Sequence, residues 1–478
     1  MITSASQTRA GAVKTALSEN YLDIQGNGWA QQYLPDLVEK EAEVFGKRTI
    51  SGFLAQVGAE EAMAADQVVW SEQGRLHLSY KGTIGTDTVS TIQLDTDIDD
   101  QDVGTTHGVR VGDTVLVASS SLTVQCYVSA INVDTGGTGQ TTATDFITAV
   151  PYSHEHLDNA GFGANDAVTV LVYGSEYAKG TEGKVGSNEP SFTTFTNKPI
   201  IMKDMYQVSG SDVSQIGWVE VSGEDGQNGY YWYLKAEGDT RSRFADYCEM
   251  SLIESEKAAT ESLALGGVLG TDEKQGTEGL FAAIESRGHQ TSGVTGVNAA
   301  TDLAEFDAIL AEFDKNGAIE ENMMFVNRAT ALAMDDMLAS MNSYGAGGTS
   351  YGVFNNSEDM ALNLGFSGFR RGSYDFYKSD WKYLNDLSTR GGINARNTAG
   401  AVRGVIIPAG VSSVYDENLG KNMKRPFLHV RYRASQTESR KLKTWITDSV
   451  GAATSDLDAM TVNYLSENCL VVQGANNF

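Results

Sequence analysis

The chain has 478 residues, and 35 Lys and Arg against 62 Asp and Glu give it a formal net charge of −27. This length predicts two to four domains of roughly 100–200 residues each, and a hydrophobic content of 41% argues against intrinsic disorder. So acidic a chain is repelled by phosphate backbones and by anionic lipid, which argues against general nucleic-acid or membrane binding.

Three cysteines lie far apart in the sequence, at Cys126, Cys248 and Cys469. An odd and widely spaced set fits neither a disulfide framework nor a zinc site. We therefore expect buried, reduced thiols. No apolar run approaches the ~20 residues of a membrane-spanning helix.

Residues 1–48 are polar and predict an N-terminal arm. One amphipathic helical pattern is present near 34–45, but the segment holds too little apolar mass to fold alone, so we expect it to dock on another surface. Residues 49–81 are mixed and predict strands. They end in an alternation that would place Leu76, Leu78 and Tyr80 on one side of a strand.

The composition changes at 82–175, where Ser, Thr, Gly and Val dominate and short β-type runs recur between turn clusters. Examples of such runs are 113–117, 125–128 and 167–172. The pattern predicts a small β-barrel or β-sandwich inserted in the chain. Residues 176–238 contain a polar strand–turn–strand pattern without a core of its own, which predicts an extended hairpin loop.

The strongest helix signal comes next. Asp239 is a good N-cap, and residues 240–265 contain neither Gly nor Pro while apolar residues recur at three- and four-residue steps. A run of about 26 residues would span roughly 39 Å. Gly266 and Gly267 would end the helix.

Two shorter helices and a β-rich C-terminal part complete the pattern. Residues 301–313 predict a helix capped by Thr301 or Asp302, with Glu305 in the capping-box position. Residues 330–341 predict a Met-rich helix that fills a core. Strands are expected in three further stretches, at about 350–412, 427–433 and 470–472.

The sequence contains no familiar catalytic signature. His154 and His156, with Asp158 nearby, could ligate a metal if both imidazoles lay on one strand face. The zincin spacing and a third ligand cluster are missing, so a solvated loop is the preferred interpretation. We expect no catalytic residue, no bound metal and no cofactor.

Basic residues are scarce, and several gather between Lys421 and Lys443. In an acidic chain, a basic C-terminal strand pair would attract acidic faces of neighbouring copies, such as the long helix. A solvated basic face is the alternative. The candidates for contacts between subunits in this region are Arg425, Arg431 and Arg433.

The order of these elements resembles a tailed-bacteriophage major capsid protein of the Hong Kong 97 type. The resemblance is most specific from Asn197 to Gly279, where Thr196–Pro199 and Tyr206–Gly210 precede the long helix as the family's extended loop precedes its spine helix. It covers residues from about 190 to 478. Similar segments follow at Leu269–Thr271, Gly279–Ile284 and Val326–Thr330.

The resemblance implies an α+β fold, the Hong Kong 97-like capsid fold, with a small β-barrel or β-sandwich domain inserted. It divides the chain into an N-terminal arm (1–48), strands leading into the peripheral region (49–81), the inserted domain (82–175), the extended loop (176–238), the peripheral domain with the spine helix (239–294), the axial domain (295–412) and a β-rich return to the peripheral domain (413–478).

The family implies a structural protein and not an enzyme. Identical subunits would assemble as hexamers and pentamers into an icosahedral shell around packaged double-stranded DNA, with a portal and cement or scaffolding proteins as further partners. The chain would be made in the host bacterial cytoplasm and end in the virion. By their position on the extended loop, Lys198, Lys203 and Tyr206 are candidates for contacts between subunits, although isopeptide cross-linking is not predicted.

Other interpretations stay open. A decoration or tail-tube subunit would suit the β-rich first half, but not the long helix and the two helices after it. A metal-dependent hydrolase using His154 and His156 would need a nucleophile, a base and an orienting group that the sequence does not bring together. For the inserted domain, sugar binding competes with a passive, shell-stabilising role, which is preferred.

Overall fold

The chain divides into two compact units in the computed structural model. We call Ser71–Phe195 the barrel unit, and Met1–Trp70 with Thr196–Phe478 the main unit. The structure describes residues 59–85, 90–103, 107–131, 146–184, 192–211, 221–222, 228–229, 231–260, 262–265, 274–317, 319–343, 368–396, 400–409, 411–416, 421–448 and 455–478. The predicted N-terminal arm and the Gly266-Gly267 pair lie outside these residues.

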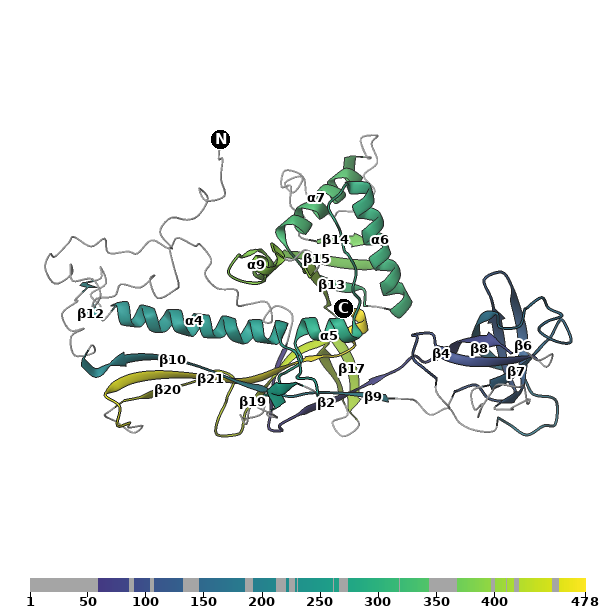
Figure 1. Ribbon diagram of the computed structural model, residues 1–478, viewed down its shortest axis with the longest axis horizontal. Coiled ribbons are helices and arrows are strands. Elements are labelled where there is room, and N and C mark those ends of the chain that lie inside the picture. Colours follow the sequence, from purple (N-terminus) through teal and green to yellow (C-terminus); the bar gives the residue numbers. More distant parts are fainter. Residues whose placement is uncertain are drawn as a thin grey trace. The chain divides into compact units, whose positions relative to one another are not determined.

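The barrel unit is a closed six-stranded barrel with the strand order β3-β4-β7-β6-β5-β8 (Figure 1). Its strands are β3 (Ser79–Ile84), β4 (Thr91–Asp97), β5 (Asp113–Ala118), β6 (Thr123–Ile131), β7 (Phe146–Pro151) and β8 (Ala167–Ser175). Closure hides the backbone edges of every strand. Inward side chains such as Ile92, Val115, Val128 and Val170 are fully buried and fill the interior.

The expected boundary at residue 82 is wrong, because it cuts through β3. The alternation expected for Leu76, Leu78 and Tyr80 is also broken. Leu76 precedes β3 and is 82% exposed, whereas Tyr80 is buried in the barrel core. The chain enters and leaves the barrel through β2 (Val68–Gln73) and β9 (Phe192–Asn197), which pair with each other.

A five-stranded sheet runs through the main unit in the order β1-β19-β21-β10, with β20 also paired to β21. β21 (Ala459–Val472) has 14 residues and is nearly all buried, so it forms the centre of this sheet. β10 pairs antiparallel with β21 along its full length, from Ile200↔Asn468 to Ser209↔Ala459. The other strands are β1 (Ala59–Met63), β10 (Ile200–Ser209), β19 (Leu428–Arg433) and β20 (Lys443–Thr447).

The long helix α4 spans Tyr231–Glu254, which is 24 residues. The predicted span of 240–265 is therefore wrong at both ends, and Asp239 lies inside the helix. The helix stops early because the chain after Glu254 pairs with a later segment: Gly279 N donates to Ser255 O at 2.7 Å, and Ala258 N donates to Gln275 O at 2.9 Å. Tertiary hydrogen bonds thus replace the intrahelical ones that the propensity of 255–265 favoured.

A second, four-stranded sheet has the order β14-β15-β13-β16 and packs against helices α6 and α7. Phe306, Phe313 and Met334 from the helices meet Met324 and Phe376 from the sheet in one buried cluster, so the methionines fill a core as predicted. The bounds are α6 (Ala299–Asn316), α7 (Arg328–Ser343), β13 (Glu321–Val326), β14 (Gly368–Arg371), β15 (Tyr374–Asp380) and β16 (Gly404–Pro408).

The cap expected for α6 is wrong. Asn298 is the N-cap, and its side chain accepts hydrogen bonds from Ala300 N and Thr301 N. Glu305 does not close a capping box but accepts from the backbone and hydroxyl of Thr295 at 2.7 and 2.9 Å. Asp302, the expected cap, instead accepts a hydrogen bond from Gly296 N at 2.8 Å.

Short elements complete the fold, which mixes helix and strand throughout. They are β11 (Val221–Ser222), β12 (Asn228–Gly229), the 3₁₀ turn η4 (Leu263–Leu265), α5 (Leu280–Arg287), α8 (Lys382–Asn385), α9 (Arg390–Asn394), β17 (Val411–Asp416), β18 (Lys421–Pro426) and the 3₁₀ turn η6 (Ala475–Asn477).

Candidate functional site

The most distinctive surface of the main unit is built on the long β10–β21 pair, with α4 lying along it (Figure 1). Phe244 and Cys248 of α4 are buried against Val462 and Tyr464 of β21. The rings of Phe244 and Tyr464 lie 6.0 Å apart between centroids. Because side chains alternate across a strand, only one face of the sheet is covered by this helix.

The opposite face carries apolar side chains that remain exposed. Ile201 and Met205 on β10 are 55% and 58% exposed. Met205 is opposite Asn463, which is opposite Trp445 on β20, so these three side chains form one row across the sheet. We call Ile201, Lys203, Met205 and Trp445 the exposed sheet face. Among the strands that the structure describes, β10 is also the last on its side of the sheet order.

The start of β10 is fixed by Asn197, which is 1% exposed. Its amide nitrogen donates to Glu278 O at 3.0 Å and to Leu470 O at 2.6 Å. Its carbonyl oxygen accepts from Lys198 N and Glu278 N at 2.9 Å. Every polar function of this buried side chain is used, so it joins the strand to β21 and to the segment before α5.

The end of α4 is fixed in a similar way by Glu254. Tyr383 Oη donates to Glu254 Oε1 at 2.6 Å, and Arg390 donates to Glu254 Oε2 at 2.8 Å. Burial, and then this hydrogen bond, raise the pKa of Tyr383 above its ordinary value. The carboxylate thereby connects the long helix to α8 and α9 of the neighbouring sheet region.

The predicted basic contact residues lie in ion pairs within the same chain. Arg431 contacts Glu61 at 2.6 Å, while Arg433 contacts Asp66 and lies 3.6 Å from Glu467. A hydrogen bond from Arg433 lowers the pKa of Asp66. These pairs hold β1 beside β19, to which it is bound as a parallel strand. Arg425 lies on β18, and its side chain is outside the described part.

The three candidates on the predicted extended loop differ in their surroundings. Lys198 Nζ donates to Gln275 Oε1 at 2.6 Å and stays exposed. Lys203 lies on the exposed sheet face opposite Leu465. Tyr206 points to the α4 side, where it packs against the cluster of Phe244 and Tyr464. Their roles between subunits stay predictions.

His154 and His156 do not share a strand face, since both lie in bends after the end of β7. Ser153 Oγ lies 2.8 Å from His154 Nδ1, and His156 lies 3.9 Å from Glu155. Among the residues that the structure describes, no three His, Cys, Asp or Glu side chains form a group that could hold a metal ion.

The cysteines are buried, and burial raises the pKa of the Cys126 and Cys469 thiols to about 12. Burial likewise raises the pKa of Cys248. A thiol is a nucleophile only as its thiolate, so all three are inert at neutral pH. No helix within the described ranges is long and apolar enough to span a membrane.

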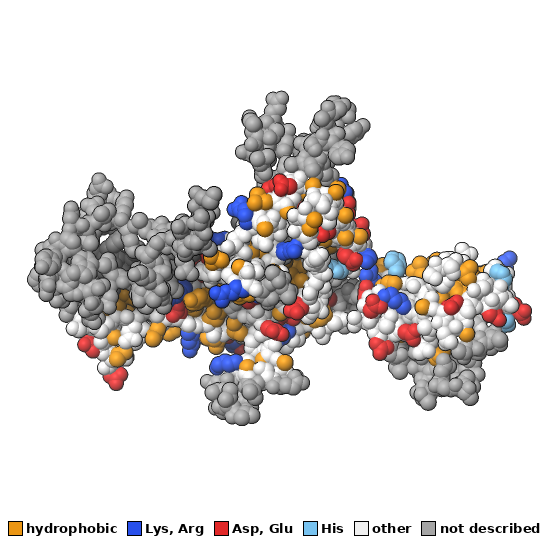
Figure 2. All heavy atoms as spheres, turned by 45° about the horizontal axis from the view of Figure 1, so that its top comes forward, with side chains coloured by type: hydrophobic (Ala, Val, Ile, Leu, Met, Phe, Trp, Pro, Cys, Tyr) orange, Lys and Arg blue, Asp and Glu red, His pale blue; other side chains and the backbone are white. Residues whose placement is uncertain are grey.

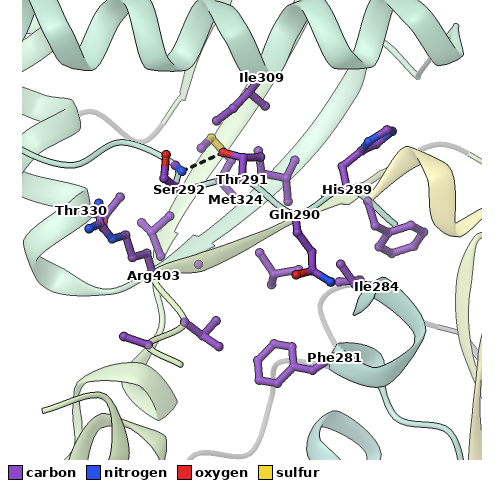
Figure 3. A pocket seen from close by; sticks show the side chains of 18 of the residues that line it. Phe281, Ile284, His289, Gln290, Thr291, Ser292, Ile309, Met324, Thr330 and Arg403 are labelled. Atoms are coloured by element: carbon purple, nitrogen blue, oxygen red, sulfur yellow. Dashed lines mark hydrogen bonds between the residues drawn. The ribbon is translucent and has the colours of Figure 1, made fainter. Parts of the chain in front are cut away.

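A cavity of about 770 Å³ lies in the main unit beside the segment His289–Val294 (Figure 3). Apolar side chains such as Phe281, Ile309 and Met324 share its lining with polar residues, among them His289 and Arg403. His289 is hydrogen bonded to Asn316, and Arg403 donates to Val294 O at 3.0 Å. Figure 3 places His289 and Arg403 on opposite sides of the cavity, so they do not converge on one point.

Comparison with known proteins gives only distant structural similarities. No family model matches the chain, and no curated protein matches it. A chain from Gordonia phage Cozz is similar at a TM-score of 0.40 and 9% identity, over 98% of this chain and 94% of that one. The capsid structure of the cyanophage P-SCSP1u gives 0.37 and 8%, over 97% and 96%.

A chain from Mycobacterium phage Ogopogo gives a TM-score of 0.36 and 9% identity, over 94% of this chain and 96% of that one. All three are chains from phage structures.

Proposed function

We propose that this chain is the structural major capsid protein of a tailed bacteriophage, with the Hong Kong 97-like fold. Its copies would assemble as hexamers and pentamers into an icosahedral shell that encloses the packaged double-stranded DNA. The observation that carries the proposal is the exposed sheet face, where Ile201 and Met205 on β10 and Trp445 on β20 are exposed apolar side chains.

An exposed apolar surface on a long strand pair is costly for a protein that stays monomeric. Exposed apolar side chains gathered on one sheet face can mark an interaction site, and a strand at the edge of the described sheet can pair with another chain. A second copy bound to this face would bury the apolar side chains and could pair with β10. Permanent interfaces of this type bury about 2,000–5,000 Å² in total, which requires extended elements such as α4 and the β10–β21 pair.

The elements of the main unit support the same proposal. α4 would be the spine helix of the peripheral domain, and the sheet of β13–β16 with α6 and α7 would be the axial domain. The barrel unit would be the insertion. The net charge of −27 also suits a container for DNA, because an acidic wall does not hold the nucleic acid tightly.

The proposal includes further assignments that follow from a capsid role. The chain would be made in the host bacterial cytoplasm and reside in the virion. Its partners would be identical subunits, a portal, and cement or scaffolding proteins. It would have no catalytic activity of its own.

Electron microscopy of the purified full chain tests the proposal. Closed shells or capsid-like sheets are expected, whereas tubes or dispersed monomers would contradict it. The Met205→Asp variant should abolish shells, because it places a charge in the proposed interface. Leu387→Asp is the matched control, since Leu387 is 79% exposed elsewhere in the main unit. If both variants assemble equally well, the exposed sheet face is not the interface.

A further inference from the structure

A second exposed patch lies on the barrel unit, and the capsid proposal does not use it. Tyr152, Tyr173 and Tyr177 are 53%, 55% and 40% exposed, and Val150 is 36% exposed. We call these four residues together with Glu176 the tyrosine patch. Figure 2 shows that hydrophobic side chains, among which tyrosine is counted, also reach the surface of this unit on the visible face.

The strand register links this part of β8 to β7 through one row of cross-strand neighbours that runs over β5 and β6. Gly174 of β8, which follows Tyr173, pairs with Thr114 of β5. Thr114 pairs with Tyr127 of β6, and Tyr127 pairs with Val150 of β7. Tyr152 Oη donates to Glu176 Oε2 at 2.5 Å, which joins the end of β7 to the end of β8. This hydrogen bond, together with burial and the charge of Glu176, raises the pKa of Tyr152 to about 12.

Two of the rings are held in place while their faces stay open. The Tyr152 ring is tethered through its hydroxyl to Glu176. The Tyr177 ring lies against Gly112, where even a Cβ atom would approach the ring to 2.8 Å. Gly112 has φ of +92°, so both its conformation and this contact require glycine. Rigid aromatic rings lose little entropy on binding, which is what a ready-made binding surface needs.

The charge of the barrel unit narrows the class of ligand. Residues 71–195 contain 5 Lys and Arg against 16 Asp and Glu, a net charge of −11. That charge disfavours nucleic acid, although bases stack well on tyrosine, and it disfavours a second copy of the same acidic unit. A neutral, hydroxyl-rich ligand meets no such repulsion.

We propose that the tyrosine patch binds a neutral carbohydrate chain. The apolar C–H faces of sugar rings would pack on the exposed Tyr173 and Tyr152 rings, and sugar hydroxyls would donate to the Glu176 carboxylate. Tyrosine suits this task because its ring offers an apolar face and its hydroxyl a polar handle. Small β-barrels of other proteins also bind oligosaccharides on their strand faces.

Biolayer interferometry with the full chain and immobilised dextran, mannan and xyloglucan tests the proposal. Wild-type protein should bind at least one of these neutral polysaccharides, with little change between low and high salt. Tyr173→Ala should weaken that binding about tenfold or more, because one stacking surface is lost. Tyr377→Ala is the matched control, since Tyr377 is 52% exposed on β15 of the main unit.

Tyr152→Phe is a milder variant that should not disturb folding, because it keeps the ring and removes only the hydrogen bond to Glu176. It should weaken binding less than Tyr173→Ala does. The proposal fails if no neutral polysaccharide binds, if only a cationic protein such as lysozyme binds, or if the Tyr173→Ala and Tyr377→Ala variants behave alike. The result is independent of shell assembly, so the two proposals can fail separately.

Discussion

The buried side chain of Asn197 donates to the carbonyl oxygen of Leu470 at 2.6 Å, across 273 residues of sequence. The same amide group bonds both the N–H and the C=O of Glu278. One side chain therefore sets the register at which β10 joins the central strand and positions the segment that leads into α5. Everything exposed on β10 follows from this alignment, because a shift of one residue would exchange its two faces.

Asn197→Leu should destabilise the main unit by roughly 3–5 kcal/mol, because several buried backbone groups lose their partners together. Urea unfolding followed by intrinsic fluorescence measures the change. Lys198→Ala is the matched control. It removes one exposed hydrogen bond to Gln275 and should cost less than about 1 kcal/mol. Equal effects of the two variants would show that Asn197 is not an anchor.

Two glycines near the long helix should respond to alanine in opposite directions. A Cβ at Gly279 would lie 2.7 Å from Ser255 O and 2.9 Å from Ile253 O, both backbone atoms at the end of α4. Gly279→Ala should therefore destabilise by about 2 kcal/mol or more. Gly238 lies within α4 with open space around it, so Gly238→Ala should stabilise by about 0.5–1 kcal/mol.

Thermal unfolding of both glycine variants, compared with wild type, measures these effects. A rise of the midpoint for Gly238→Ala with a fall for Gly279→Ala is expected. A fall for both would mean that α4 does not extend through residue 238.

The ion pair of Arg431 and Glu61 should contribute measurably to holding β1 beside β19. The side chains are 16% and 31% exposed, so solvent screens the pair less than a surface pair. In a double-mutant cycle with Arg431→Gln and Glu61→Gln, we expect a coupling energy of about 1 kcal/mol. Amide hydrogen exchange of Glu61 and Ala62, measured on the same variants, should become faster.

The exposed pair Glu312 and Lys315, at 42% and 66%, provides the comparison for this cycle. Its coupling energy should not exceed about 0.5 kcal/mol. If the coupling of Arg431 and Glu61 is no larger than that, this ion pair does not help to hold β1 beside β19.

Alkaline pH should weaken the core through Tyr374. Burial, and then its hydrogen bond to Asp314 at 2.7 Å, raise the pKa of this tyrosine from 10 to about 12. The folded state thus retains the proton longer than the unfolded state, and the contribution is complete below pH 10 and is lost as pH rises toward 12. The full loss would be roughly 2–3 kcal/mol.

Urea unfolding of wild type and Tyr374→Phe between pH 8 and 11 checks this expectation. Wild-type stability should fall above pH 10 more steeply than that of the variant. Tyr377→Phe, an exposed ring on the same strand, should keep the pH profile of the wild type. Parallel profiles for wild type and Tyr374→Phe would exclude the role of Tyr374.

The sequence predicts the types of the elements better than their ends. The apolar periodicity predicts a long helix at 240–265, whereas α4 spans Tyr231–Glu254. Its C-terminal end was not predictable, because the chain after Glu254 forms hydrogen bonds from Gly279 N to Ser255 O and from Ala258 N to Gln275 O. Those partners are distant in sequence. Local propensity contains no information about them, and the same holds for Asn197 and Leu470.

The exposed sheet face left a signal in the sequence that the pattern analysis missed. In Ile200–Ser209, apolar residues occur at both parities: Ile201 and Met205 on one side, Met202 and Tyr206 on the other. A strand that is apolar on both faces is expected to be covered on both, and within the described residues α4 covers one of them. The tyrosine patch had no comparable signal, because its members come together only when β5–β8 close.

The pairing of β2 with β9 has a practical consequence. The two places where the polypeptide crosses between the units are hydrogen bonded to each other, so the ends of the insertion are already adjacent. Excising residues 74–191, between β2 and β9, and bridging the gap with a few glycines would keep this strand pair. The same position could accept a foreign domain whose termini lie close together, so it is a suitable insertion site for displaying such domains.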